Sequence, residues 1–447
     1  MTANTSIYRE LSAQLRDLEI ITDIDRVTKL SLDYYHFSPI LESQLKDKRG
    51  DLVIRPTTEA EVVRVAKACV REKVSLTVRG AGTGNYGQCI PLKGGVVLDL
   101  SKMNQIKWLQ PGIACVEPGI KMAAFDKQAR EIGWELRIAP STYRTATIGG
   151  FFGGGSVGMG SITYGQIKDR GNLRSVRLVT MEDEPQVLEL KGDEVQKIIH
   201  GYGTTGIVTE LEIALAPAYP WQEVIVVFDD FMTAVKFGQA LSDSAGIVKK
   251  LVSIHGAPIP NYFTALQAYL PQGKHCALLM IAEYDLEPLQ DLVKESSATI
   301  TYSNAAQAVK GTSLLEFTWN HTTLHARNVD PSITYLQTFY FTVEKVEQMY
   351  RYFGDEIAIH LEFLKAAGKA VPAGLQLLRF TTAERLQEII DYHEANGAFI
   401  ANPHVYTIED GGDKQIDDDK VAFKQQIDPY GLLNPGKMRG FSPLKKI

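Results

Sequence analysis

Residues 74–87 read "VSLTVRGAGTGNYG", a β-branched strand pattern followed by a loop in which glycine recurs as G-x-G-x-x-G. In a nicotinamide-binding fold, the last glycine of this pattern opens a helix that faces the cofactor pyrophosphate. Here the next residues are "QCIPLKGG", and their proline and two glycines disfavour a three-turn helix before the strand predicted at 94–100. The pattern therefore predicts a strand–loop–strand unit whose backbone N–H groups can bind an anion.

A second glycine cluster, "ATIGGFFGGGSVGMGSITYG" (146–165), holds eight glycines in the seventeen residues that start at Gly149. Glycine costs conformational entropy at every position, so this density indicates that the backbone must approach another molecule closely. A long, flat ligand lying along a loop would meet that need. A third element, "GYGTTGIVTELEIAL" (201–215), predicts a glycine turn that enters an alternating strand.

The sequence around these clusters predicts a mixed α+β fold. The segment 57–73 has apolar residues on one helical face and Thr57 or Thr58 as its cap. From Trp221 onward, strands and helices alternate, which is typical of a sheet covered by helices. The segment 380–397 is the clearest helix, with a capping box formed by Thr381 and Glu384.

Composition excludes several classes of protein. The net charge of −6 argues against a nucleic-acid binder, and no apolar run is long enough to span a bilayer. The four cysteines have no metal-ligand or C-x-x-C spacing, so a reducing cytoplasm is expected. The sequence is also compatible with a homo-oligomer and with peripheral attachment to a membrane.

In this order, the motifs resemble the FAD-binding domain shared by vanillyl-alcohol oxidase, p-cresol methylhydroxylase (the PCMH-type domain) and the D-lactate and glycolate dehydrogenases. The resemblance runs from "DLVIRPTTEAEVVRVAKACVREKVSLTVRGAGTGNYG" through "GGVVLDLSKMNQI" to "TGIVTELEIALAP", and it resumes in the tail "DPYGLLNPGKM" (428–438). It implies two α/β subdomains that bind FAD and a substrate domain with a helix-covered antiparallel sheet. The boundaries expected are a helical lead-in at 1–48, the FAD-binding domain at 49–218, the substrate domain at 219–400, and a C-terminal segment at 401–447 that returns to the flavin.

The resemblance also implies which residues bind FAD. The first loop would hold the pyrophosphate, and the segment 140–154 would run beside the flavin. The start of the strand at 207–208 would contact the nucleotide end of FAD, and the tail at 428–438 would return to the flavin ring. The residues concerned are Gly80, Ala81, Gly82, Thr83, Gly84, Asn85, Pro140, Ser141, Thr142, Thr147, Gly149, Gly150, Gly154, Ile207, Val208, Asn434 and Lys437. Some relatives attach FAD through a histidine in the first loop. None of the nine histidines lies between His36 and His200, so non-covalent FAD is expected.

Oxidation of an alcohol carbon needs a base for the hydroxyl proton, and a cation would orient a substrate carboxylate. His404 is the predicted base, because it precedes the tail that should return to the flavin, with His321 or His325 in support. Arg327 is the candidate cation. His321 and His325 lie four residues apart but have no evident third metal ligand, and either could also be an ordinary structural histidine; we expect no metal site.

The expected function is thus FAD-dependent oxidation of an alcohol carbon by hydride transfer to flavin N5, with a D-2-hydroxy acid such as lactate or glycolate as one substrate class. The histidine-rich "GHxGDGNxH" stretch of the hydroxy-acid dehydrogenases is missing, which leaves sugars, polyols and other alcohols as alternatives. A non-catalytic flavin-binding protein is a third alternative. The electron acceptor is open among oxygen, a quinone, a cytochrome and a partner flavoprotein.

Overall fold

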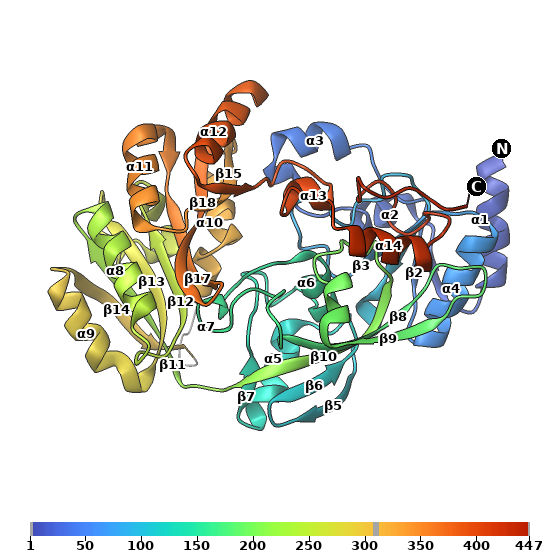
Figure 1. Ribbon diagram of the computed structural model, residues 1–447, viewed down its shortest axis with the longest axis horizontal. Helices are drawn as coiled ribbons and strands as arrows, with labels where there is room; N and C mark the ends of the chain where they lie inside the picture. The colour runs from blue at the N-terminus through green and yellow to red at the C-terminus, as the bar shows by residue number, and fades with distance from the viewer. Residues whose placement is uncertain (1–2, 307–312, 446–447) are drawn as a thin grey trace.

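The computed structural model describes residues 3–306 and 313–445, which form three β-sheets surrounded by helices (Figure 1). The chain has two halves: the first two sheets lie in one half and the largest sheet lies in the other (Figure 1). Both chain ends lie in the half that contains the first two sheets. The predicted α+β class is confirmed. Among the described residues, no helix is both long and apolar enough to cross a membrane.

The first sheet has the strand order β1-β2-β4-β3, and its strands β2, β4 and β3 are parallel. Helix α4 connects β2 to β3 and buries Val62 and Cys69; its cap is Thr58, whose side chain accepts the N–H of Glu61. The loop 80–95 between β3 and β4 contains no helix, as the sequence predicts. The elements of this part are α1 (Ala3–Gln14), β1 (Glu19–Ile21), α2 (Ile24–Leu30), α3 (Pro39–Leu45), β2 (Leu52–Arg55), α4 (Glu59–Arg71), β3 (Leu76–Arg79) and β4 (Val96–Asp99).

The second sheet is antiparallel, with the order β5-β6-β10-β8-β9 and with β7 paired to β10. Its elements are β5 (Ile106–Gln110), β6 (Ile113–Val116), α5 (Met122–Glu131), β7 (Trp134–Leu136), α6 (Ile148–Gly154), α7 (Ser161–Tyr164), β8 (Leu173–Val179), β9 (Val187–Lys191) and β10 (Ile207–Pro217). The structure corrects one expectation here: residues 148–154 form helix α6 and not a loop. Thr147 caps this helix by accepting the N–H of Gly150.

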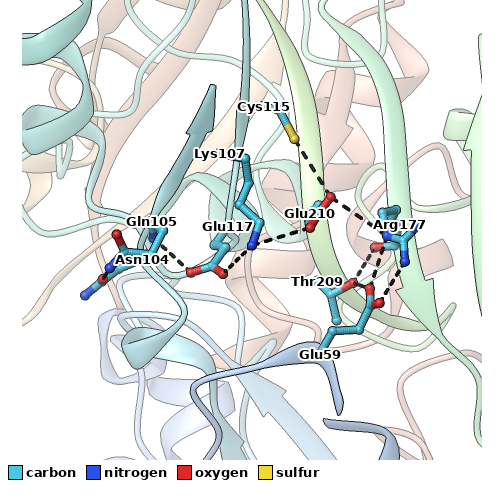
Figure 2. A network of polar contacts seen from close by, with 9 residues as sticks. All are labelled: Glu59, Asn104, Gln105, Lys107, Cys115, Glu117, Arg177, Thr209 and Glu210. Atoms are coloured by element: carbon cyan, nitrogen blue, oxygen red, sulfur yellow. Dashed lines mark hydrogen bonds and ion pairs between the residues drawn. The ribbon is translucent and has the colours of Figure 1, made fainter. Parts of the chain in front are cut away.

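A row of charged side chains joins α4 to the second sheet (Figure 2). Arg177 on β8 donates two hydrogen bonds, of 2.7 and 3.2 Å, to Glu59 at the start of α4. Glu210 on β10 lies 3.8 Å from Arg177 and 3.7 Å from Lys107, and Lys107 pairs with Glu117 at 3.2 Å. Because at least one member of each pair is partly exposed, each pair contributes little stability, on the order of 0–1 kcal/mol. Arg177 and Glu59 join α4 to the sheet, and Glu210 and Lys107 continue the row of alternating charges along the sheet.

The third sheet is antiparallel, with the order β14-β11-β13-β12-β17-β18-β15-β19 and with β16 paired to β18. Val224 and Val226 face the core beneath α8, α9, α11 and α12, whereas Ile225 faces the opposite core, as the two-residue period of a strand requires. The elements are β11 (Trp221–Phe228), α8 (Phe231–Asp243), β12 (Lys249–His255), β13 (His275–Ala282), α9 (Leu286–Glu295), β14 (Thr299–Ala305), α10 (Asn320–Val329), β15 (Ile333–Phe339), α11 (Val343–Phe353), β16 (Ile357–Ala358), β17 (His360–Ala366), β18 (Lys369–Arg379), α12 (Ala383–Ala395) and β19 (Phe399–Ala401). Helix α12 is confirmed, but its cap is Thr382 and not Thr381.

The C-terminal segment crosses back to the first half through α13 (Ile408–Gly411) and α14 (Asp418–Ile427) (Figure 1). Its tail lies against β3: the N–H of Leu76 donates to Leu432, and the N–H of Asn434 donates to Leu76, at 2.8 and 2.7 Å. The predicted docking of this turn-rich tail is therefore seen as backbone hydrogen bonding to the strand that carries the first glycine loop.

Candidate functional site

A cavity of about 710 Å³ lies between the glycine-rich segments and the third sheet. All of the residues predicted to bind FAD line this cavity except Ile207, Asn434 and Lys437. The cavity is within the size range of sites for cofactors and small molecules. The first loop is also tied to the third sheet, because the side-chain amide of Asn85 donates to the hydroxyl of Tyr335 at 2.6 Å. The cavity therefore has two walls, which we call the glycine wall (residues 80–85 and 147–157) and the cap wall (residues 316–325 with Gln337 and Leu375).

The glycine wall is built from bare backbone. A Cβ atom on Gly80 would lie 2.1 Å from Thr147 Oγ1, so the first loop and the cap of α6 can approach only if residue 80 is glycine. Gly82 has a φ of +66°, which a side chain rarely permits. Gly153 differs, because a Cβ atom there would meet no other atom within 4 Å. One face of α6 is thus left open toward the cavity.

Three predicted cofactor residues lie behind the wall. Ile207 is fully buried in the core between the first two sheets. The side-chain amide of Asn434 donates to the carbonyl oxygens of Gln88 and Tyr202, two residues that line the cavity. Lys437 is also fully buried, and its ammonium group donates to the carbonyl of Gly87. In the structure, the two tail residues hold wall segments from behind and do not line the cavity.

The cap wall carries a carboxylate–imidazole pair. Helix α10 places His321 on the cavity, and Nδ1 of His321 lies 3.1 Å from Oε2 of Glu316. The other carboxylate oxygen of Glu316 lies 3.1 Å from Nε of Arg144, which comes from the FAD-binding half. The hydrogen bond from His321 lowers the pKa of Glu316, and nearby Arg144 acts in the same direction. Glu316 is therefore ionised at neutral pH, and it orients the imidazole of His321.

The residue before α10, Trp319, has an unusual backbone conformation. Trp319 lines the cavity with a φ of +51°, a conformation that costs on the order of 1–3 kcal/mol for a residue with a side chain. Its N–H donates to Oε1 of the buried Glu362 at 2.7 Å, which holds this conformation. His325, one turn after His321, also lines the cavity, and its Nε2–H donates to the carbonyl of Glu316 at 2.9 Å.

His404 and Arg327 do not line the cavity. His404 is buried, with Nε2 donating to the carbonyl of Tyr335 at 2.9 Å and Nδ1 accepting from Ser38 Oγ at 2.7 Å. Burial lowers the pKa of His404 to about 4, so the ring is neutral at physiological pH. Arg327 donates to the carbonyl of Ile333, and its guanidinium lies 5.6 Å from the centre of the Phe37 ring. Both polar groups are already engaged within the protein, and neither residue is among those that line the cavity.

Several cavity residues are absent from the sequence predictions. Asp33 and Arg79 line the cavity near the first loop, and Tyr202 and His200 line it next to α6. The Nδ1 atom of His200 lies 3.1 Å from the carbonyl oxygen of Gly155. The sequence does offer a signal for Glu316, because this carboxylate lies close in the chain to the predicted His321. No local pattern indicates Asp33.

Four residues that line the cavity carry a buried polar atom without a hydrogen-bond partner among the described residues: Asp33, Tyr202, Trp319 and Asn320. Oδ2 of Asp33 and the hydroxyl of Tyr202 are buried, and neither makes a hydrogen bond to another described residue. Buried polar atoms are nearly always satisfied, so unpaired ones in a cavity wall indicate that a ligand provides the partner. Together with the bare glycine backbone, these atoms fit a large polar cofactor such as FAD.

Comparisons with known proteins agree with this geometry. Residues 50–188 match a family described as FAD binding domain. The chain is 30% identical to D-lactate dehydrogenase of Anaerostipes hadrus over 286 residues, or 58% of this chain and 57% of that protein. It is 24% identical to glycolate oxidase subunit GlcD of Bacillus subtilis (strain 168) over 438 residues, or 89% of this chain and 90% of that protein. The chain spans about half the length of several relatives that it matches.

A solved structure of alkyldihydroxyacetonephosphate synthase shares the fold, with a TM-score of 0.74 and 17% identity over 97% of this chain and 85% of that one. The chain therefore contains an FAD-binding domain of the kind that its motifs resemble, and FAD as its cofactor is confirmed.

Proposed function

We propose that this FAD-binding protein is an oxidoreductase that oxidises the CH–OH carbon of a small alcohol or hydroxy acid. The observation that carries the proposal is the single cavity that joins the glycine wall to the Glu316–His321 pair. A cofactor on one wall and an oriented imidazole on the other are the parts that alcohol oxidation requires. The relatives named D-lactate dehydrogenase and glycolate oxidase support the same class of reaction.

In this proposal His321 is the base that accepts the proton of the substrate hydroxyl. Since its Nδ1–H faces the Glu316 carboxylate, Nε2 is the atom that can accept a proton. The Glu316 carboxylate then stabilises the positive charge that His321 gains. When bound, FAD supplies the acceptor for the hydride that leaves the same carbon. His325 supports the site by fixing the backbone of Glu316.

A D-2-hydroxy acid such as lactate or glycolate is the proposed substrate class. Arg144 lines the cavity from the FAD-binding half and reaches Glu316 on the cap wall, and its side chain is 57% exposed. It can therefore also meet a substrate carboxylate, a role first expected of Arg327. Sugars and polyols are the competing substrates, and they would not need this arginine.

We further propose that FAD is held without a covalent bond and that its electrons pass to a separate acceptor. The first loop contains no histidine, and the cavity histidines come from other segments. Acid precipitation of the purified protein should release all of the yellow colour into the supernatant. Colour that stays with the precipitate would show a covalent link.

The function is tested by mixing the yellow protein anaerobically with D- and L-hydroxy acids, aldoses and simple alcohols, and following the flavin absorbance. We expect at least one D-2-hydroxy acid to bleach the flavin. Adding oxygen, a quinone or cytochrome c to the reduced protein then identifies the class of acceptor. If dithionite bleaches the flavin and no substrate does, the protein only binds flavin. Bleaching by aldoses alone would assign the substrate to the sugars.

A further inference from the structure

Three charged side chains meet beneath the first glycine loop. Asp33 comes from the segment before α3, Arg79 from the end of β3, and Lys437 from the C-terminal tail. Their exposed fractions are 6%, 7% and 0%. Asp33 and Arg79 line the cavity, and Lys437 lies directly behind the loop at Gly87. Three buried ionisable groups at a cofactor cavity require an electrostatic explanation, because burying charge is costly.

The two cations are not neutralised by ion pairs. Arg79 donates to backbone carbonyl oxygens of the first loop and of the segment before Asp33, at Leu32 and Ala81 among others, with distances of 3.1 and 2.9 Å. Lys437 donates to the carbonyl of Gly87 and lies 5.0 Å from the centre of the Tyr406 ring. Within residues 3–306 and 313–445, neither cation has a carboxylate within 4.0 Å. Burial lowers the pKa of Lys437, and the charge of Asp33 opposes that effect.

Asp33 is the only carboxyl group in this cluster of three. Its Oδ1 accepts the N–H of Tyr35 at 2.9 Å, whereas its buried Oδ2 has no partner in the protein. Burial raises the pKa of Asp33 to about 7, although Lys437 and then Arg79 act to lower it. The other titratable groups that face Asp33 or interact with its charge are Cys89, Tyr35, Tyr202 and Tyr335. This carboxyl therefore holds its proton more tightly than an ordinary aspartic acid does.

The charges of the cluster depend on that proton. With Asp33 ionised and both cations charged, the cluster has a net charge of +1; with Asp33 protonated, the charge is +2. FAD brings two negative charges on its diphosphate into the same cavity. An added anion in a low-dielectric site disfavours a neighbouring carboxylate and favours neighbouring cations. Cofactor binding should therefore change the protonation of this cluster.

We propose that Asp33 is a proton-binding residue of the FAD cavity, which takes up a proton when FAD binds, so that Arg79 and Lys437 face the anionic cofactor without an opposing carboxylate. The protonated Oδ2 also gains an O–H donor for the ligand. Asp33 lies outside residues 50–188, so the segment before the matched FAD-binding domain completes the cofactor site. The inference depends on the cavity being the FAD site and not on the proposed oxidation.

The test is calorimetric titration of the flavin-free protein with FAD at pH 7.5, in phosphate and in Tris, whose ionisation enthalpies differ. The difference between the two apparent enthalpies gives the number of protons taken up. From a pKa of about 7, a rise of one unit gives an uptake of about half a proton per FAD at this pH, and a larger rise gives a larger uptake. For a rise of one unit, FAD affinity should correspondingly fall by about sixfold from pH 6.5 to pH 8.5.

Asp33→Asn is the matched variant, since asparagine resembles the protonated carboxyl. It should keep FAD binding, lose at least half of the proton uptake, and flatten the dependence of affinity on pH. Asp47→Asn, which changes an exposed carboxyl just after α3, should behave like the unaltered protein. Zero proton uptake by the unaltered protein would overturn the proposal even if Asp33→Asn fails to fold. Equal uptake in the unaltered protein and in Asp33→Asn would overturn it too.

Discussion

The two walls of the cavity are made in opposite ways. The glycine wall exposes backbone, with residues such as Gly80 and Gly82 that cannot carry a side chain without a clash or strain. The cap wall exposes side chains, with His321 oriented by Glu316 and with the start of α10 held by Glu362. The difference separates two tasks. In the function that we propose, the glycine wall binds the cofactor through backbone groups, and the cap wall supplies the groups that move a proton.

The largest expected effect is on the glycine wall. Gly153→Leu adds a side chain where the protein itself leaves open space, and leucine is a better helix former than glycine. The flavin-free protein should therefore keep or gain stability, whereas FAD binding should be lost. Thermal unfolding and the flavin spectrum of the purified variant measure both effects.

Gly246→Leu is its control, because Gly246 also has open space but does not line the cavity. It should bind FAD normally. Normal FAD occupancy in Gly153→Leu would mean that the open face of α6 is not where the cofactor lies.

On the cap wall, Glu316→Gln should slow flavin reduction by substrate about tenfold or more, because the amide cannot stabilise a charged His321. FAD occupancy should not change. The substitution should alter the pH dependence of flavin reduction and leave the pH dependence of FAD binding as it is. Stopped-flow absorbance under anaerobic conditions measures the rate. Glu356→Gln removes a carboxylate paired with Arg385 on the surface and should have no effect. Equal rates in Glu316→Gln and the unaltered protein would remove the pair from the mechanism.

Arg144→Ala should raise the KM for a carboxylate substrate about tenfold, as expected for loss of one charge-assisted hydrogen bond. A neutral alcohol should show no change in KM. Both KM values are measured in the same preparation. If both rise equally, Arg144 acts only through Glu316 and the argument for an anionic substrate fails.

The smallest catalytic effect is expected for His404→Ala. Since His404 makes two buried hydrogen bonds away from the cavity, its loss should lower the free energy of unfolding by about 1–3 kcal/mol. Flavin reduction should slow less than threefold. Denaturant unfolding and stopped-flow measurements separate the two effects. A hundredfold slower reduction with unchanged stability would return the catalytic role to His404.

The sequence predicts the glycine wall well, because that wall depends on local composition. Glycine density and the strands on either side of the first loop are visible without knowledge of tertiary structure. The main local error is α6, where the glycines indicated a loop, although Thr147 caps a helix. Glycine disfavours a helix only on average, and tertiary contacts can outweigh that preference.

The cap wall is less predictable, because it depends on where side chains point after folding. His404 precedes the docking tail, as the sequence suggests, but its ring faces Ser38 and Tyr335. Arg327 shares α10 with His321 and faces Phe37 instead of the cavity. Asp33 is brought to the site by a segment that carries no recognised motif. The sequence therefore identifies α10 as a helix with candidate site residues. Only the structure shows which face of this helix lines the cavity.

The central claim is that one wall binds FAD and the other handles the substrate proton, and His321→Ala tests it most directly. The measurement is the rate constant of anaerobic flavin reduction by the best substrate of the panel, together with the FAD dissociation constant, in the unaltered protein and the variant. We predict that reduction slows about a hundredfold or more, as is typical for loss of a general base, while the dissociation constant changes less than about threefold. Reduction at an unchanged rate with FAD fully bound would contradict the account.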